Sequence, residues 1–263
     1  MVKKVEIGIS TACFYPRVVL EDSIKLMKSL GFNKGEVFFN CPSEFSDEFV
    51  KVIKERCNES DFKINSVHAF SSAFEPYIFD TYKRRRNDMI KYFKQVCRAG
   101  KALGAKSYTF HGMRKMDSEF VDINHVIDVY NELVYISEEA GITLAQENVS
   151  WCMSGELKFL KEIKERCKYP IHFTLDLKQA YRADKEPDDY IDIMKENIVN
   201  LHINDKTKES SCLVPGKGEI DYSKLFNKLR GLNYKGMGII EVYSSNYLHY
   251  EELRESRRYL SKF

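Results

Sequence analysis

The pattern that most constrains the fold of this chain is an alternation of short apolar runs with longer amphipathic stretches, repeated eight times along the sequence. The apolar runs have the length of strands, and the amphipathic stretches have the length of helices. Several helical stretches stop at a glycine, such as Gly31, Gly104 and Gly141, where the left-handed backbone of a helix end is easily adopted. Strands that alternate with helices pair in parallel through right-handed crossovers. Eight such units therefore predict an α/β protein with the closed (β/α)8 architecture of a TIM barrel.

The length of the chain agrees with one such barrel, because the chain has 263 residues and this architecture typically takes about 250. No linker rich in Pro, Gly or Ser interrupts the pattern, so we expect residues 1–263 to form a single domain. The predicted strands cover 5–11, 35–40, 63–68, 106–111, 142–147, 171–176, 199–202 and 236–243. The predicted helices cover 18–30, 45–59, 75–103, 119–140, 155–167, 188–196, 222–230 and 247–260.

The fifth to eighth predicted strands each end in a carboxylate or an imidazole. These residues are Glu147, Asp176, His202 and Glu241. The carboxyl ends of barrel strands open on one face, which is the face that carries active sites. A buried carboxylate has to be paired, protonated or bound to a metal. Because oxygen and imidazole ligands suit Mn²⁺, Co²⁺, Mg²⁺ or Zn²⁺, the four residues predict a site for one divalent metal ion.

Two histidines end the third and fourth predicted strands and should face the same mouth of the barrel. We expect His68 and His111 to donate hydrogen bonds to substrate oxygens, with ligation of a second metal ion as the alternative. Trp151, the only tryptophan, follows the fifth strand and is expected to line the pocket.

A loop with two glycines, residues 211–222, leads into the helix predicted at 222–230. Asp221 should cap this helix, because Asp is among the preferred residues at that position. The loop either covers the mouth as a lid or serves as a plain connection. Lys217 within it is a candidate substrate contact, and four basic residues could hold a substrate phosphate: Arg114, Lys178, Lys206 and Lys217.

The composition narrows the partners and the compartment. The chain has 41 basic and 39 acidic residues, a balance that disfavours nucleic acid as a partner. The seven cysteines contain no C-x-x-C pair, which favours reduced thiols and a cytoplasmic location. No apolar run approaches the roughly 20 residues that span a bilayer, so we expect no membrane insertion. The oligomeric state stays open, a homo-oligomer included.

Short motifs along nearly the whole chain carry a family resemblance. In order they are V-H-A (67–69), the helix and strand of 86–112, Q-E-N (146–148), L-D-L-K-Q-A (175–180), L-H-I-N-D (201–205), P-G-K-G-E-I-D-Y (215–222) and I-I-E (239–241). Each is weak alone, but their order resembles the xylose isomerase-like TIM-barrel superfamily. That superfamily includes sugar phosphate isomerases and epimerases and the endonuclease IV-type AP endonucleases (AP endonuclease family 2). The resemblance implies that Glu147, Asp176, His202 and Glu241 are the metal ligands.

The resemblance further implies an isomerase or epimerase that acts on a sugar or sugar phosphate through an enediolate. By similarity to the ketose 3-epimerases, Glu147 and Glu241 would face each other across the substrate, one as general base and the other as general acid. His68, His111 and Gln179 would hydrogen-bond substrate oxygens.

Two departures from the superfamily bear on the alternatives. The sixth-strand motif often reads D-x-x-H, but here Gln179 replaces the histidine. The Asp-x-His pair of the nucleases is missing between Asp205 and Gly218. These departures disfavour a three-zinc AP endonuclease. An inosose-type dehydratase and a non-catalytic sugar-binding barrel remain as further alternatives.

Overall fold

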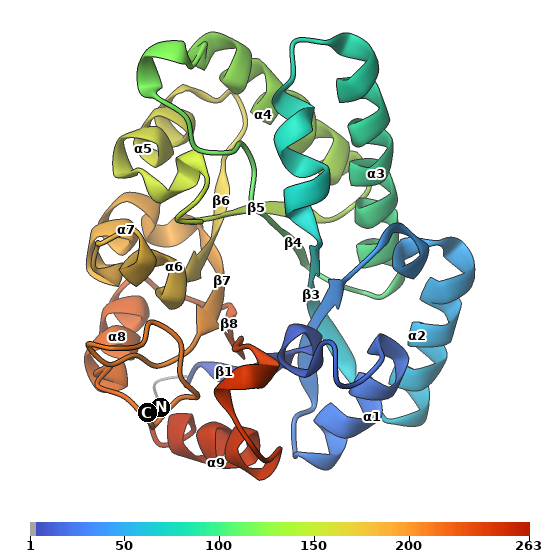
Figure 1. The fold of residues 1–263 in the computed structure, drawn as a ribbon, viewed down its shortest axis with the longest axis vertical. Coiled ribbons are helices and arrows are strands. Elements are labelled where there is room, and N and C mark those ends of the chain that lie inside the picture. The colour runs from blue at the N-terminus through green and yellow to red at the C-terminus, as the bar shows by residue number, and fades with distance from the viewer. Residues whose placement is uncertain (1–3) are drawn as a thin grey trace.

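The computed structural model describes residues 4–263, and these form a closed barrel of eight parallel strands in the order of the chain, surrounded by helices (Figure 1). The predicted TIM barrel is therefore confirmed. The strands are β1 (Glu6–Ser10), β2 (Lys34–Phe39), β3 (Lys63–Ala69), β4 (Ser107–Phe110), β5 (Thr143–Glu147), β6 (His172–Asp176), β7 (Ile198–Ile203) and β8 (Met237–Ile240). Pairing of β8 with β1, with Glu6 opposite Met237, closes the ring.

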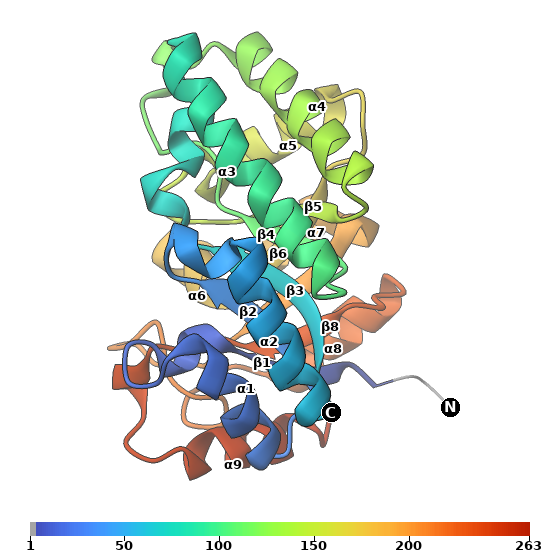
Figure 2. The same cartoon turned by 90° about the vertical axis from the view of Figure 1, so that its right-hand side faces the viewer.

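The helices pack around the outside of the barrel, and the side view shows α3 running along it as the longest of them (Figure 2). They are α1 (Leu20–Ser29), α2 (Asp47–Glu59), α3 (Lys83–Ala102), α4 (Ile123–Glu139), α5 (Leu157–Arg166), α6 (Leu177–Arg182), α7 (Pro187–Met194), α8 (Tyr222–Gly231) and α9 (Glu251–Leu260). None of the helices in the described residues is long and apolar enough to cross a membrane.

Four helices differ from the prediction, and one of them is α9, which was predicted from 247 and begins at Glu251. The stretch 75–103 is not continuous: a 3-10 turn covers Glu75–Phe79, and α3 begins only at Lys83. Asp80 between them is extended, and its side chain accepts a hydrogen bond from the Tyr82 amide. The helix predicted from 119 begins at Ile123, because Asp122 caps it. The short helix α6, which follows β6 directly, was not predicted at all.

Strands β4 and β6 place small and polar side chains inside the barrel and bulky apolar ones outside, because successive side chains of a strand point to opposite faces. Inside, the Thr109 and Thr174 hydroxyls lie 3.0 Å apart, and Ser66 donates a hydrogen bond of 2.7 Å to Glu36. Outside, Tyr108, Phe110, Phe173 and Leu175 are fully buried in the core against the helices. The barrel interior is therefore a polar column that leads to the carboxyl ends of the strands.

Candidate active site

The four residues predicted at the ends of β5 to β8 converge on one point. Each of Glu147, Asp176, His202 and Glu241 offers one ligand atom, and these atoms all lie within 4.8 Å of one another. The Nδ1 atom of His202 lies 3.0 Å from Glu147 Oε1, 3.6 Å from Asp176 Oδ2 and 3.5 Å from Glu241 Oε2. All four side chains are buried.

Strand register explains why residues so far apart in sequence meet. Asp176 is paired with His202, and His202 with Ile239 on β8, two residues before Glu241. The Glu241 amide continues this pairing by donating a hydrogen bond of 3.0 Å to the Ile203 carbonyl. Each side chain therefore leaves its strand at nearly the same height in the barrel.

The geometry fits a divalent metal ion. Asp176 caps α6 with Oδ1, which accepts the Gln179 amide at 2.9 Å, so Oδ2 is left to face the cluster. Asp176 Oδ2 and Glu147 Oε2 are buried, and their neighbours are cationic groups, with Lys178 Nζ 3.3 Å from the first and His111 Nε2 2.8 Å from the second. Such oxygen atoms are costly unless a cation compensates them. Glu147, Asp176, His202 and Glu241 together could hold the ion.

The cationic side chains around Glu147 and Glu241 determine the protonation of these two glutamates. Burial alone would raise the pKa of Glu147, but the His111 and His202 imidazoles hold that pKa well below its ordinary value. Burial likewise acts to raise the pKa of Glu241, which Lys178 and His202 keep well below its ordinary value. Both glutamates are therefore carboxylates at neutral pH and are suited to accept a proton or bind a cation.

The two histidines predicted on β3 and after β4 lie side by side at the same mouth. Their Nε2 atoms are 2.7 Å apart, and His111 Nε2 is 2.8 Å from Glu147 Oε2. His68, His111 and Glu147 form a second group of side chains that could hold a metal ion, and Glu147 belongs to both groups. Either expected use of the histidines, as substrate contacts or as ligands of a second ion, is compatible with this position.

The other predicted contacts differ in position. Trp151 is half-buried and stacks edge-on against His111, with ring centroids 5.5 Å apart, so it lies beside the cluster. The Gln179 side-chain oxygen accepts hydrogen bonds from the Ser150 amide and hydroxyl, so it ties α6 to the end of β5. Lys217 is exposed on its loop and lies near Glu252 of α9, and its role as a substrate contact stays a prediction.

Sequence reasoning missed Glu36, on the inner face of β2. This fully buried glutamate lies 3.1 Å from His202 Nε2 and accepts hydrogen bonds from Ser66 and Asn200. Burial raises the pKa of Glu36, but His202 and His68 more than offset this and lower it to about 2. A carboxylate that holds the far nitrogen of a ligand histidine fixes the ring orientation. The sequence did contain a signal for Glu36: it lies in the predicted strand 35–40, where alternation turns every second side chain toward the barrel interior.

Sequence reasoning also assigned Lys178 only to possible phosphate binding. Its ammonium instead lies inside the cluster, 2.8 Å from Glu241 Oε2. The signal was its position two residues after Asp176, within the first turn of a helix that the sequence did not reveal.

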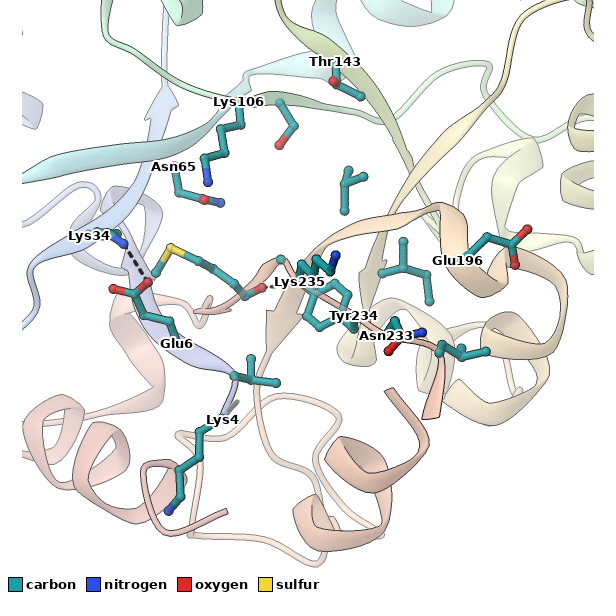
Figure 3. Close-up of a pocket in the computed structure, with 17 residues that line it drawn as sticks. Lys4, Glu6, Lys34, Asn65, Lys106, Thr143, Glu196, Asn233, Tyr234 and Lys235 are labelled. Atoms are coloured by element: carbon teal, nitrogen blue, oxygen red, sulfur yellow. Dashed lines mark hydrogen bonds and ion pairs between the residues drawn. The ribbon is translucent and has the colours of Figure 1, made fainter. Parts of the chain in front are cut away.

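A separate pocket of about 560 Å³ lies at the opposite, amino-terminal mouth of the barrel (Figure 3). Lysine side chains surround it, and one of them, Lys34, is paired with Glu6 at 2.7 Å. None of the residues that line this pocket belongs to the predicted site. The pocket is therefore separate from the cluster at the carboxyl-end mouth.

Comparisons with known proteins agree with this architecture. A family model described as a xylose isomerase-like TIM barrel matches residues 24–263. No curated protein matches the chain.

Several solved structures share the fold over almost the full length of both chains. The 3-keto-D-glucoside 4-epimerase YcjR from E. coli has 17% sequence identity and a TM-score of 0.79, covering 99% of this chain and all of its own. A D-tagatose 3-epimerase-like protein has 18% identity and a TM-score of 0.82, covering 98% and 96%. The IolI protein with a bound zinc atom has 18% identity and a TM-score of 0.78, covering 97% and 96%. At these identities the likeness establishes the fold.

Proposed function

The chain belongs to the xylose isomerase-like TIM-barrel family, and from that premise we propose that it is a metal-dependent isomerase or epimerase of a ketose, a related sugar or a sugar phosphate. The observation that carries the proposal is the convergence of Glu147, Asp176, His202 and Glu241 on one buried point. The structural neighbours support the substrate class, since they include sugar epimerases, one of them solved in the presence of D-fructose.

The two glutamates would move the proton. One of Glu147 and Glu241 takes the proton from the carbon next to the substrate carbonyl, the C–H bond breaks, and its electron pair forms an enediolate. The other glutamate, after taking up a proton from solvent, gives that proton to the opposite face, which inverts that carbon, and the first glutamate then releases its proton to solvent. A bound divalent ion would supply the Lewis-acid charge that stabilises the oxyanion. Both carboxylates contact His202 Nδ1, at 3.0 and 3.5 Å, so they flank the same point.

The remaining residues would hold and orient the sugar. His68 and His111 would hydrogen-bond two neighbouring oxygens of the sugar, and their rings lie against each other beside Glu147. Trp151 would present an apolar edge to the sugar carbons, because it packs against His111 at the mouth.

The first test is metal content, measured by elemental analysis of protein purified without a metal-chelating tag, followed by a ketose and ketose-phosphate screen with that metal. About one divalent ion per chain and interconversion of a sugar pair, detected by chromatography, would support the proposal. A chain that takes up no Mn²⁺, Co²⁺, Mg²⁺ or Zn²⁺ would count against it and favour a sugar-binding barrel.

A second candidate is a zinc-dependent AP endonuclease, favoured by the second group formed by His68, His111 and Glu147. Two zinc ions per chain together with cleavage of abasic DNA would establish it. An inosose-type dehydratase would use the same glutamates and then expel hydroxide, so an unsaturated or deoxygenated product would identify it.

A further inference from the structure

Lys178 extends into the candidate metal centre and not into solvent. It is the second residue of α6, and only 3% of it is exposed. A buried ammonium is costly unless it is paired, and Lys178 Nζ lies 2.8 Å from Glu241 Oε2 and 3.3 Å from Asp176 Oδ2. The chain thus supplies a cation of its own to a cluster of carboxylates.

The two oxygen atoms that Lys178 contacts are the ones turned toward the metal position. Asp176 Oδ2 and Glu241 Oε2 lie 3.6 and 3.5 Å from His202 Nδ1, the nitrogen that faces the cluster. The second oxygen of Asp176 is already used to cap α6, so Asp176 has one oxygen to offer a cation. The ammonium and a divalent ion therefore compete for the same atoms.

Direct contact of both cations with these oxygens is unfavourable. A divalent ion of this kind binds carboxylate oxygen at about 2.0–2.2 Å, so an ammonium on the same two oxygens would lie only a few ångströms from it. Like charges at that separation in a buried site repel strongly.

In this same position the ammonium also faces the ring of a partly exposed tyrosine, toward which it can move away from the carboxylates. The Tyr243 ring centroid lies 5.2 Å from Lys178 Nζ, and Tyr243 is 46% exposed. An aromatic face attracts an ammonium at this distance. Arg182 holds this ring in place by donating a hydrogen bond of 2.9 Å to the Tyr243 hydroxyl.

We infer that Lys178 is a resident counter-cation of this centre, which a divalent ion has to displace toward Tyr243 in order to bind. The inference rests on the metal centre of the proposed function. Metal binding is then an exchange of one cation for another, and it is weaker than the four ligands alone would make it. The cluster without metal is stabilised by the ammonium.

The test is the affinity for Mn²⁺, measured by calorimetry at one fixed pH on metal-free protein. Lys178→Met removes the charge at similar length, and Lys178→Gln keeps a hydrogen-bond donor in case the first variant does not fold. Lys168→Met is the matched control, because Lys168 also lies over a tyrosine ring, at 5.1 Å from Tyr169, and has no part in the cluster. The exchange predicts a dissociation constant about tenfold lower or more in both Lys178 variants and an unchanged one in the control.

Thermal melting provides a readout that does not depend on turnover. Metal-free Lys178→Met should melt at a lower temperature than metal-free wild type. Addition of Mn²⁺ should raise the melting temperature of the variant by more than it raises that of wild type. If wild type binds Mn²⁺ and both Lys178 variants bind it equally or more weakly, the cation exchange is overturned and the metal centre stands. Absence of Mn²⁺ binding in every protein overturns the metal centre and the exchange together.

Discussion

At the scale of single residues, we expect turnover to depend on Glu147 and Glu241. Glu147→Gln or Glu241→Gln keeps the shape of the side chain and removes the carboxylate that carries the proton. Loss of a general acid or base typically costs a factor of about 10²–10⁴, so each variant should retain less than about a tenth of the wild-type rate. The measurement is the initial rate on the sugar pair found in the screen, with circular dichroism to verify the fold. Glu156→Gln, on the surface and paired with Lys115, is the control.

A variant of Glu147 or Glu241 that stays folded and keeps more than that rate would contradict the acid–base assignment. It would leave metal binding by the remaining ligands as a separate question.

Glu36 is the residue that orients His202 from behind. With Glu36 accepting a hydrogen bond from Nε2, the His202 ring presents Nδ1 to Glu147 and to the other two predicted ligands. Glu36→Gln weakens this support, and loss of such a partner typically costs about 10–100-fold in metal affinity. Calorimetric titration with Mn²⁺ measures the change. Glu6 is an exposed glutamate at the other end of the barrel, so Glu6→Gln should bind Mn²⁺ with the affinity of wild type. Equal affinity of wild type and Glu36→Gln would remove Glu36 from the support of the site.

At the scale of elements, Asp176 connects a strand end to the helix that follows. One carboxylate oxygen starts α6, and the other faces the cluster. Helix α6 in turn brings Lys178 into the site, and Gln179 holds the end of β5 through Ser150. A single residue thus positions two later side chains, because the cap sets where the helix begins.

The loop between β7 and α8 is folded around Asp205. This buried carboxylate accepts hydrogen bonds from the Lys206 and Ile220 amides at Oδ1 and from the Gly216 amide at Oδ2. A side chain at Gly218 would collide with the same carboxylate, so only glycine fits there. The interpretation as a fixed connection is therefore favoured over a mobile lid. Asp221 caps α8, as predicted, by accepting the Lys224 amide.

Asp205→Ala should loosen this loop, because three backbone amides lose their acceptor. Each such hydrogen bond contributes about 0.5–1.5 kcal/mol to the free energy of unfolding, so the variant should be less stable in urea denaturation. Trypsin should also cut the variant faster at the lysines of the loop. Glu209→Ala, an exposed change in the same loop, is the control. A loss of stability no larger than in this control would show that the loop does not depend on Asp205.

At the scale of the whole molecule, His172 at the amino end of β6 makes stability depend on pH. Burial lowers the pKa of this imidazole below its ordinary value of 6.5, against a smaller opposing effect of Glu138. As pH falls through 6.5, the unfolded chain takes up the proton before the folded chain does, so the folded state loses stability. The contribution of His172 is measured as the difference between wild type and a His172 variant in how far the urea midpoint changes from pH 7.5 to 5.5, because the raised pKa values of His68 and His202 act in the opposite direction.

His172→Gln removes this titration, so its stability should fall less than that of wild type over the same interval. His249→Gln changes an exposed residue before α9, so the stability of this variant should change with pH as much as that of wild type. An equal loss in wild type and His172→Gln would assign the pH dependence to other groups.

The sequence by itself determined the number and order of strand–helix units and the four polar strand ends, because apolar periodicity and strand direction are local properties of the chain. The tertiary structure alone decided the rest of the centre. Glu36 meets His202 only because the barrel closes across strands that are far apart in sequence. Lys178 enters the cluster only because the Asp176 cap begins a helix there. Local patterns indicate the face of the strand that carries Glu36 and the position of Lys178 after Asp176, but not the side chains that each one meets, since these depend on where closure and packing place distant residues.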